Sequence, residues 1–187
     1  GKSTYQVSQM GIARTFQNIR LYNNLSVLDN VKVGMHNGIR ENLAAAITHG
    51  FGFRKAEKQA EQAAMEMLDF FSLADLAQAP AGSLPYGAQR RLEIVRALAS
   101  GPLILLLDEP AAGLNPRERR EFVDILRKVY DSGVDLFLIE HNMDVVMNLS
   151  HRITVLSFGC KIAEGTPEEI QHDPQVIKAY LGSGKGE

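Results

Sequence analysis

The feature that most constrains the fold is an uninterrupted apolar run at residues 103–107, which ends in the acidic pair Asp108 and Glu109. Such a run is typical of a strand that is buried on both sides within a parallel sheet. Ligands of open α/β sheets bind beyond the carboxyl ends of the strands, so the run places two carboxylates at such an edge. There an aspartate can hold Mg²⁺ and a glutamate can polarise an attacking water. The alternative interpretation is a strand that simply ends in solvated acids.

Strand and helix patterns alternate after this run. Asn115 and Pro116 are typical of an N-cap followed by proline at the first helical position, and they predict a helix to about Asp131. Later runs predict a buried strand at 134–139, a short helix at 142–149 and a third strand at 153–158. Gly159 is predicted to turn that strand back into a return strand at 161–163. This alternation predicts an α/β chain with a parallel sheet covered on both faces.

The first hundred residues are mostly helical in pattern. After a short strand at 11–16, apolar periodicity predicts helices at 25–33, 54–76 and 87–99. The segment 84–91, LPYGAQRR, opens the last of these helices, and a glycine at a helix start lets the backbone approach a phosphate. A plainly capped helix is the alternative there. Gln17 and His141, each just after a predicted strand, are ordinary surface residues when considered singly.

The composition excludes several classes of protein. Lys and Arg number 20 against 22 Asp and Glu, for a formal charge of −2, so the sequence offers no basic field for nucleic acid. The single cysteine, Cys160, excludes an internal disulfide and cannot alone hold a metal cluster. No apolar run reaches the ~18 residues of a membrane span, and the first ten residues lack a signal peptide's apolar region. We therefore expect a cytosolic α/β unit.

Taken in chain order, these features resemble the ATP-binding subunit of an ABC transporter over essentially the whole chain. Gln17 matches the Q-loop glutamine, and residues 84–89 match the signature motif. Asp108 and Glu109 match the Walker B acids, residues 112–115 match the D-loop, and His141 matches the switch histidine. The strings GIARTFQNIRLY, RRLEIVRALA, DEPAAGLNP and EGTPEEIQHDPQVIKAYLG are similar to the branched-chain amino acid uptake branch. Pro85 stands where the signature usually has a serine, and Ala88 stands at another position that usually has a polar or small residue.

The resemblance implies a fold and a set of roles. The fold is a P-loop NTPase-like parallel sheet with an inserted helical subdomain: a core at 1–17 and 101–165, the subdomain at about 18–100, and a C-terminal helix and tail at 166–187. Glu109 would orient or deprotonate the water, His141 would contact the γ-phosphate of ATP, and Gln17 would sense the metal and the nucleophile. Asp108 and Gln17 would hold Mg²⁺. The residues implied to contact ATP are Tyr86, Gly87, Ala88, Gln89 and Asn115.

The resemblance also implies partners. Two such subunits, identical or different, would sandwich two ATP molecules and bind transmembrane permease subunits at the cytoplasmic face of the membrane, with a solute-binding protein as an indirect partner and no nucleic acid. Candidates for the groove that receives the permease are Leu21, Tyr22, Leu25 and Val27, with local core as the alternative. An ABC-type ATPase outside transport and a nucleotide-dependent interaction module remain the competing functions.

The opening residues do not complete a phosphate-binding loop. Residues 1–4, GKST, match only the end of the motif G-x-x-x-x-G-K-[ST], without its first glycine or the preceding strand. Lys2 also lies only 15 positions before Gln17, which is too close for this family. We expect the phosphate-loop lysine and the residue that stacks on adenine to be absent from this stretch. Taken alone, it should bind MgATP weakly or not at all.

Overall fold

The computed structural model describes residues 1–35 and 51–181, with side chains at 56–180 in the second range. The chain forms two compact units, Gly1–Ile139 and Glu140–Glu187. Part of the predicted helical subdomain, 36–50, and the predicted tail, 182–187, lie outside the described residues. Within the part of the chain that is described, no helix has the length and apolar character needed to cross a membrane.

A parallel sheet organises the first unit. Its strands are β1 (Ile12–Arg14), β2 (Ile104–Asp108) and β3 (Asp135–Ile139), in the spatial order β1-β2-β3. The central strand β2 takes up residues 104–107 of the predicted apolar run. Leu105 and Leu107 are buried, but the residues that alternate with them are partly exposed and Leu103, before the strand, is 67% exposed, so the prediction of burial on both sides was wrong. The structure confirms the predicted parallel α/β sheet and places Asp108 at the end of its middle strand.

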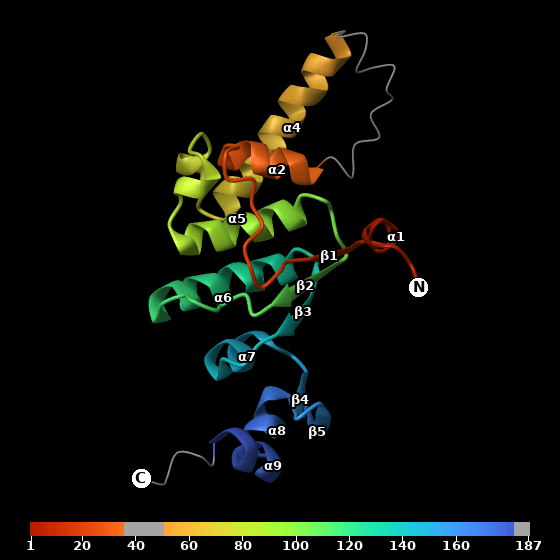
Figure 1. The fold of residues 1–187 in the computed structure, drawn as a ribbon, viewed down its shortest axis with the longest axis vertical. Helices are drawn as coiled ribbons and strands as arrows, with labels where there is room; N and C mark the ends of the chain where they lie inside the picture. The colour runs from red at the N-terminus through yellow and green to blue at the C-terminus, as the bar shows by residue number, and fades with distance from the viewer. Residues whose placement is uncertain (36–50, 182–187) are drawn as a thin grey trace. The chain divides into compact units, whose positions relative to one another are not determined.

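The helices that the structure describes in the first unit are α1 (Thr4–Gln9), α2 (Val27–Met35), α4 (Phe51–Phe70), α5 (Tyr86–Leu98) and α6 (Pro116–Asp131). Figure 1 shows α2, α4 and α5 gathered in one helical layer, and α2 packs on both of the others. Two short 3₁₀ turns, Ala74–Leu76 and Ala81–Ser83, connect α4 to α5. The buried side chains of this layer include Val31, Leu68 and Leu92.

Helix α4 ends earlier than the sequence predicted. The prediction extended it to residue 76, but it stops at Phe70. Ser72 adopts a left-handed backbone, with φ of 53°, and the Leu73 N–H donates to the Leu68 carbonyl at 2.8 Å. This is a helix-ending motif that usually contains glycine at the left-handed position. A serine there gave no signal in the sequence.

The prediction that 134–139 is a buried strand was wrong. In the described part of the chain β3 pairs with β2, its exposure alternates, and Phe137 and Ile139 are 59% and 53% exposed. Apolar composition alone therefore did not show that one face of this strand is exposed.

The second unit contains a hairpin in place of a further parallel strand. β4 (Ile153–Ser157) and β5 (Cys160–Gly165) pair antiparallel, and Gly159, with φ of 79°, makes the predicted turn. The parallel alternation predicted for 153–158 was therefore wrong, whereas the return strand is confirmed. The helical elements of the unit are α7 (Met143–Leu149), α8 (Pro167–His172), α9 (Pro174–Val176) and the π-helical turn η3 (Ile177–Leu181). Its core is formed by Ile153, Ile170 and Val176.

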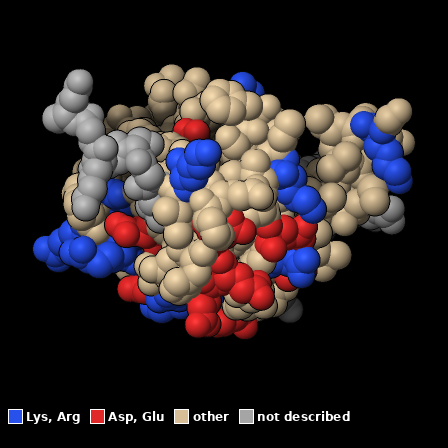
Figure 2. Space-filling view, turned by 90° about the horizontal axis from the view of Figure 1, so that it is seen from below, with Lys and Arg blue, Asp and Glu red and all other residues tan. Residues whose placement is uncertain are grey.

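Acidic and basic side chains are interspersed on the molecular face drawn in Figure 2, with the acidic ones gathered toward its centre. A mixed surface agrees with the near-even numbers of acidic and basic residues in the sequence.

Candidate functional site

Gln17 and Glu109 meet at the carboxyl end of the parallel sheet. The Gln17 Nε2 donates to Glu109 Oε2 at 3.0 Å, although the two residues are 92 positions apart in the chain. Glu109 follows β2 directly, and its own N–H donates to the Ile139 carbonyl of β3 at 2.9 Å. Its backbone φ is 45°, a left-handed conformation that a glutamate adopts only where its surroundings impose it. The strand register thus directs this carboxylate toward the chain segment that follows β1.

Asp108 lies beside Arg14 on the neighbouring strand. The Arg14 Nη2 is 3.0 Å from Asp108 Oδ2, and both side chains are partly exposed. Arg14 pairs with Leu106 in the parallel register, two residues before Asp108, so its long side chain reaches forward to the acid. Exposed ion pairs of this kind contribute at most about 1 kcal/mol to stability. Asp108 therefore lies at the carboxyl edge of the sheet, as predicted, and little free energy is needed to separate it from the Arg14 guanidinium.

The signature segment begins helix α5 with a proline. Pro85 is the N-cap and provides no capping side chain, while its carbonyl accepts from the N–H groups of Ala88 and Gln89 at 3.0 Å each. The Ala88 side chain is buried, and the Gln89 Nε2 donates to the Leu84 carbonyl at 2.9 Å. Two of the predicted ATP contacts are thus used in the structure to build the start of the helix.

The predicted D-loop packs against this helix start. Gly113 has φ of 77°, and a β-carbon placed there would lie 2.9 Å from Cε1 of the Tyr86 ring. Asn115 caps α6, since its Oδ1 accepts from the N–H groups of Arg117 and Glu118 at 2.9 and 3.0 Å. Gly87 faces the same Glu118 side chain. The structure therefore brings Tyr86, Gly87 and Asn115 into one neighbourhood.

His141 belongs to the second unit. Its N–H donates to Glu140 Oε2 at 3.1 Å, and the Asn142 N–H donates to the same oxygen at 3.2 Å. Asn142 in turn caps α7. Glu140 thus fixes the backbone at His141, and the role of this histidine toward ATP stays a prediction.

A groove of about 990 Å³ opens between α1, β1, α2 and α5. Leu21 and Tyr22, two of the four predicted permease contacts, line it together with Val33 and Arg96. Val27 is fully buried and belongs to the core, as the alternative interpretation held. The segment after Gln17 therefore contributes to both the groove and the core.

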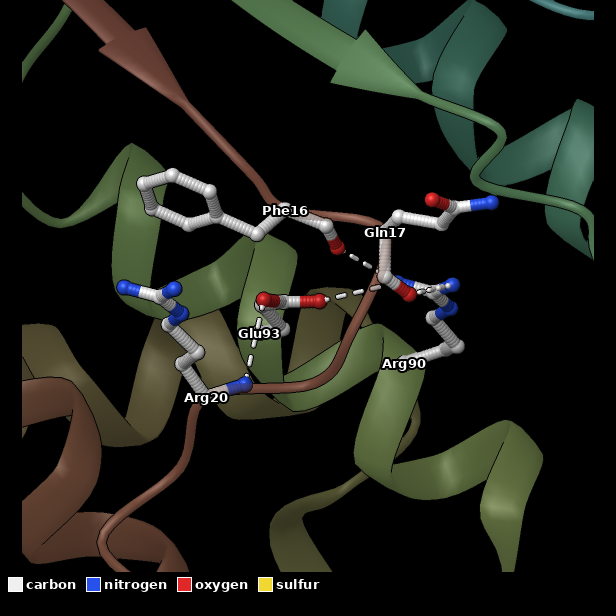
Figure 3. A network of polar contacts seen from close by, with 5 residues as sticks. All are labelled: Phe16, Gln17, Arg20, Arg90 and Glu93. Carbon is white, nitrogen blue, oxygen red and sulfur yellow. Dashed lines mark hydrogen bonds and ion pairs between the residues drawn. The ribbon is translucent and has the colours of Figure 1, made fainter.

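One buried ion pair was missed by the sequence reasoning. Arg90 and Glu93 on α5 are each 2% exposed, and their side chains pair at 3.1 Å. Arg90 also donates to the carbonyls of Phe16 and Gln17, as Figure 3 shows. Arginine and glutamate are read as surface residues in a sequence, although their i,i+3 spacing among apolar residues was an available signal.

The residues near the sheet edge fit a magnesium ion that arrives with a phosphate ligand. No group of three or more His, Cys, Asp or Glu side chains that could hold a metal occurs among the described residues. Mg²⁺ in phosphate-transfer sites typically takes one or two protein carboxylates and completes its shell with waters and phosphate oxygens. The Asp108 carboxylate and the Gln17 amide oxygen are donors of that hard, oxygen type.

Comparison with known proteins decides the family. The ABC transporter family model matches residues 2–112. The chain belongs to the ABC transporter family. A second family model, the branched-chain amino acid ATP-binding cassette transporter, matches residues 160–185. The resemblance predicted from the motifs is confirmed, and Gln17, the signature segment and the pair Asp108 and Glu109 all fall inside the first match.

Curated relatives of the family align along most of the chain. The high-affinity branched-chain amino acid transport ATP-binding protein BraF of Pseudomonas aeruginosa is 41% identical over 183 residues, covering 97% of this chain and 72% of that protein. LivG of Escherichia coli (strain K12), a protein of the same description, is 41% identical over 178 residues, covering 95% and 70%. The solved ADP conformation of MJ1267, an ATP-binding cassette of an ABC transporter, superposes with a TM-score of 0.77 at 29% identity, covering 97% and 72%. The fold is therefore that of an ABC ATPase.

Proposed function

We propose that the chain is the ATP-hydrolysing subunit of an ABC importer for branched-chain amino acids. Its family membership supports ATP hydrolysis, and the names of the two relatives above together with the C-terminal family match support the solute class. Transport would draw on an assembly of two ATP-binding subunits, identical or different, with transmembrane permease subunits and, indirectly, a solute-binding protein. The subunit would then lie peripherally at the cytoplasmic face of the membrane.

The observation that carries the proposal is the 3.0 Å hydrogen bond from Gln17 to Glu109. A hydrolytic site needs a carboxylate that accepts a proton from water and a polar group that fixes the carboxylate's orientation. Glu109 supplies the first, held by its backbone hydrogen bond to β3, and Gln17 supplies the second. Because the Gln17 amide has both a donor and an acceptor, it can hold Glu109 and an incoming water together.

Asp108 would hold the magnesium ion that accompanies ATP. The ion would supply positive charge that stabilises the charge developing on the phosphate oxygens of ATP. The Arg14 guanidinium pairs with Asp108 at 3.0 Å. This exposed pair costs little to separate, so the carboxylate can exchange its partner when the nucleotide arrives.

The start of α5 and the D-loop would face the nucleotide of the partner subunit. Tyr86, Gly87 and Asn115 gather there, at the positive end of the α5 dipole, where phosphate charge is favoured. His141 would contact the γ-phosphate, as the family motif predicts. The groove lined by Leu21 and Tyr22 is our candidate for permease docking, because it is the 990 Å³ hollow beside the Gln17 segment.

Replacing Glu109 by glutamine tests the proposal. In the assembled transporter, Glu109→Gln should still bind ATP, because the side chain keeps its shape, and should reduce kcat by about 10²–10⁴-fold through loss of the general base. Glu121→Gln is a matched control on exposed α6, where Glu121 pairs at the surface with Arg117 at 3.0 Å. Nucleotide binding and phosphate release are measured separately. A Glu109→Gln subunit that hydrolyses ATP at the wild-type rate would exclude Glu109 as the base.

A further inference from the structure

Helix α5 buries a complete ion pair directly beneath the Gln17 segment. Arg90 and Glu93 are each 2% exposed, and the Arg90 Nη1 lies 3.1 Å from Glu93 Oε2. Apolar side chains of the same volume would often stabilise a core as well as or better than such a pair. Stability alone therefore does not account for the ion pair, and its other hydrogen bonds indicate a second role.

The pair holds the backbone on both sides of Gln17. The Arg90 Nη1 donates to the Phe16 carbonyl at 3.0 Å, and its Nη2 donates to the Gln17 carbonyl at 2.7 Å. Glu93 accepts from the Arg20 N–H at 3.3 Å through its other oxygen. Figure 3 shows these contacts converging on the segment 16–20 from one side. Only a planar guanidinium offers two nitrogens in the fixed geometry that meets two successive carbonyls.

The Gln17 side chain extends away from the backbone atoms that Arg90 and Glu93 hold. In Figure 3 it points away from Arg90, and its Nε2 donates to Glu109 Oε2 at 3.0 Å. A continuous series of contacts therefore joins the signature helix to the proposed catalytic carboxylate: Arg90, the Gln17 backbone, the Gln17 amide and Glu109. The two links between different residues are hydrogen bonds of 2.7 and 3.0 Å, and the link within Gln17 is covalent.

We propose that Arg90 and Glu93 are positioning residues for ATP hydrolysis. They hold residues 16–20 on α5 so that the Gln17 amide meets Glu109, and a displacement of α5 moves that amide relative to the carboxylate. Neither residue contacts the nucleotide. This inference rests on the proposed function, because Glu109 is the group that is being positioned.

A conservative variant tests the positioning role. Arg90→Lys keeps a cation beside Glu93 but cannot donate to both carbonyls in a fixed geometry. A displacement of about 1 Å at a reacting group can lower the rate by up to about 10²-fold, so we expect kcat for ATP hydrolysis to fall by about 10- to 100-fold. The KM for MgATP should change by a smaller factor than kcat, because Arg90 does not touch the nucleotide and Asp108 still provides its carboxylate for the magnesium ion.

The Gln17→Ala background separates positioning from a structural effect. If Arg90 acts through Gln17, adding Arg90→Lys to Gln17→Ala should change kcat by less than about twofold, because the two residues act as one unit. A purely structural role would reduce kcat by the same factor in both backgrounds. Full multiplication of the two losses, or an unchanged kcat in Arg90→Lys alone, would overturn the proposal.

A second variant keeps the test decisive if Arg90→Lys folds poorly. Arg90→Met/Glu93→Leu removes both charges together and fills the same volume, a replacement that is often neutral for stability. The Arg20 amide then loses its Glu93 acceptor and should exchange its hydrogen at least about tenfold faster, without general unfolding. Arg127→Met is the control, since Arg127 forms an i,i+3 pair with Asp124 at 3.4 Å on the exposed face of α6.

The exchange measurement distinguishes the two proposals. If the assembled wild-type transporter hydrolyses no ATP, the proposed function fails, and the Arg20 exchange rate still decides whether the pair holds the segment. An unchanged hydrogen-exchange rate of the Arg20 amide in Arg90→Met/Glu93→Leu would show that the ion pair does not hold residues 16–20. Faster exchange together with a fall in kcat that disappears in the Gln17→Ala background would establish that it does.

Discussion

Gly34→Ala tests the closest approach between helices α2 and α5. A β-carbon at Gly34 would overlap the Arg96 backbone carbonyl oxygen and would lie 3.0 Å from Ala99 Cβ and 3.1 Å from Arg96 Cγ. Alanine in a helix interior normally stabilises by about 1 kcal/mol relative to glycine. Here the added methyl group would meet the backbone carbonyl of Arg96, which cannot rotate away as a side chain can, so α2 and α5 must move apart. Overpacking of this kind costs about 1–3 kcal/mol, and we expect the upper end.

The balance predicts a net loss of about 2 kcal/mol in the free energy of unfolding, because about 3 kcal/mol of overpacking exceeds about 1 kcal/mol of helix propensity. For a chain of this size, that loss lowers Tm by about 4–8 °C, measurable by calorimetry or by urea unfolding. Adding Ala99→Gly should not restore stability, because the Arg96 carbonyl remains in place. A Gly34→Ala protein more stable than wild type would show that α2 and α5 do not pack this closely.

Two further predictions concern local stability. Asn115→Ala should lower the free energy of unfolding by about 1 kcal/mol, measured by urea unfolding, because the side chain that caps two backbone N–H groups of α6 is lost. Asn115→Asp keeps a capping oxygen and should retain the stability. Equal losses in the two variants would contradict the capping role. Hydrogen bonds from Lys161 and then Arg152 lower the pKa of Glu164 below its ordinary value. The stabilisation this gives is present above the unfolded pKa and is lost as pH falls through the lowered folded pKa, so Glu164→Gln should flatten that part of the acid unfolding profile.

Much of the local structure could be predicted from the sequence, because its signals are local. Asn115 and Pro116 specify the start of α6 through backbone geometry and capping, and the structure shows both the capping box and the proline at the first helical position. The run at 103–107 specifies β2 through its unbroken apolar character. The order of these motifs was sufficient to identify the family, as the family match over residues 2–112 confirms.

The parts that could not be predicted depend on pairings between distant residues. Nothing local to Arg90 indicates that the carbonyls of Phe16 and Gln17, more than seventy positions earlier, will supply its hydrogen-bond acceptors. The exposed face of β3 depends on which distant segments pack on it, and not on the composition of β3. In the same way, the pairing of Arg14 with Asp108 follows from the register of β1 against β2.

The structure also narrows which groups of the signature segment can meet a phosphate. Sequence reasoning assigned that task to four successive residues, yet the N–H groups of Ala88 and Gln89 already donate to the Pro85 carbonyl. Helix geometry leaves the earliest N–H groups without an intrahelical acceptor, and in α5 these belong to Tyr86 and Gly87. Pro85 supplies no hydroxyl, so if this segment binds a phosphate as we propose, these two amides and the helix dipole would provide the attraction. The proposal therefore depends on backbone groups at the start of α5, which no side-chain substitution at residue 85 removes.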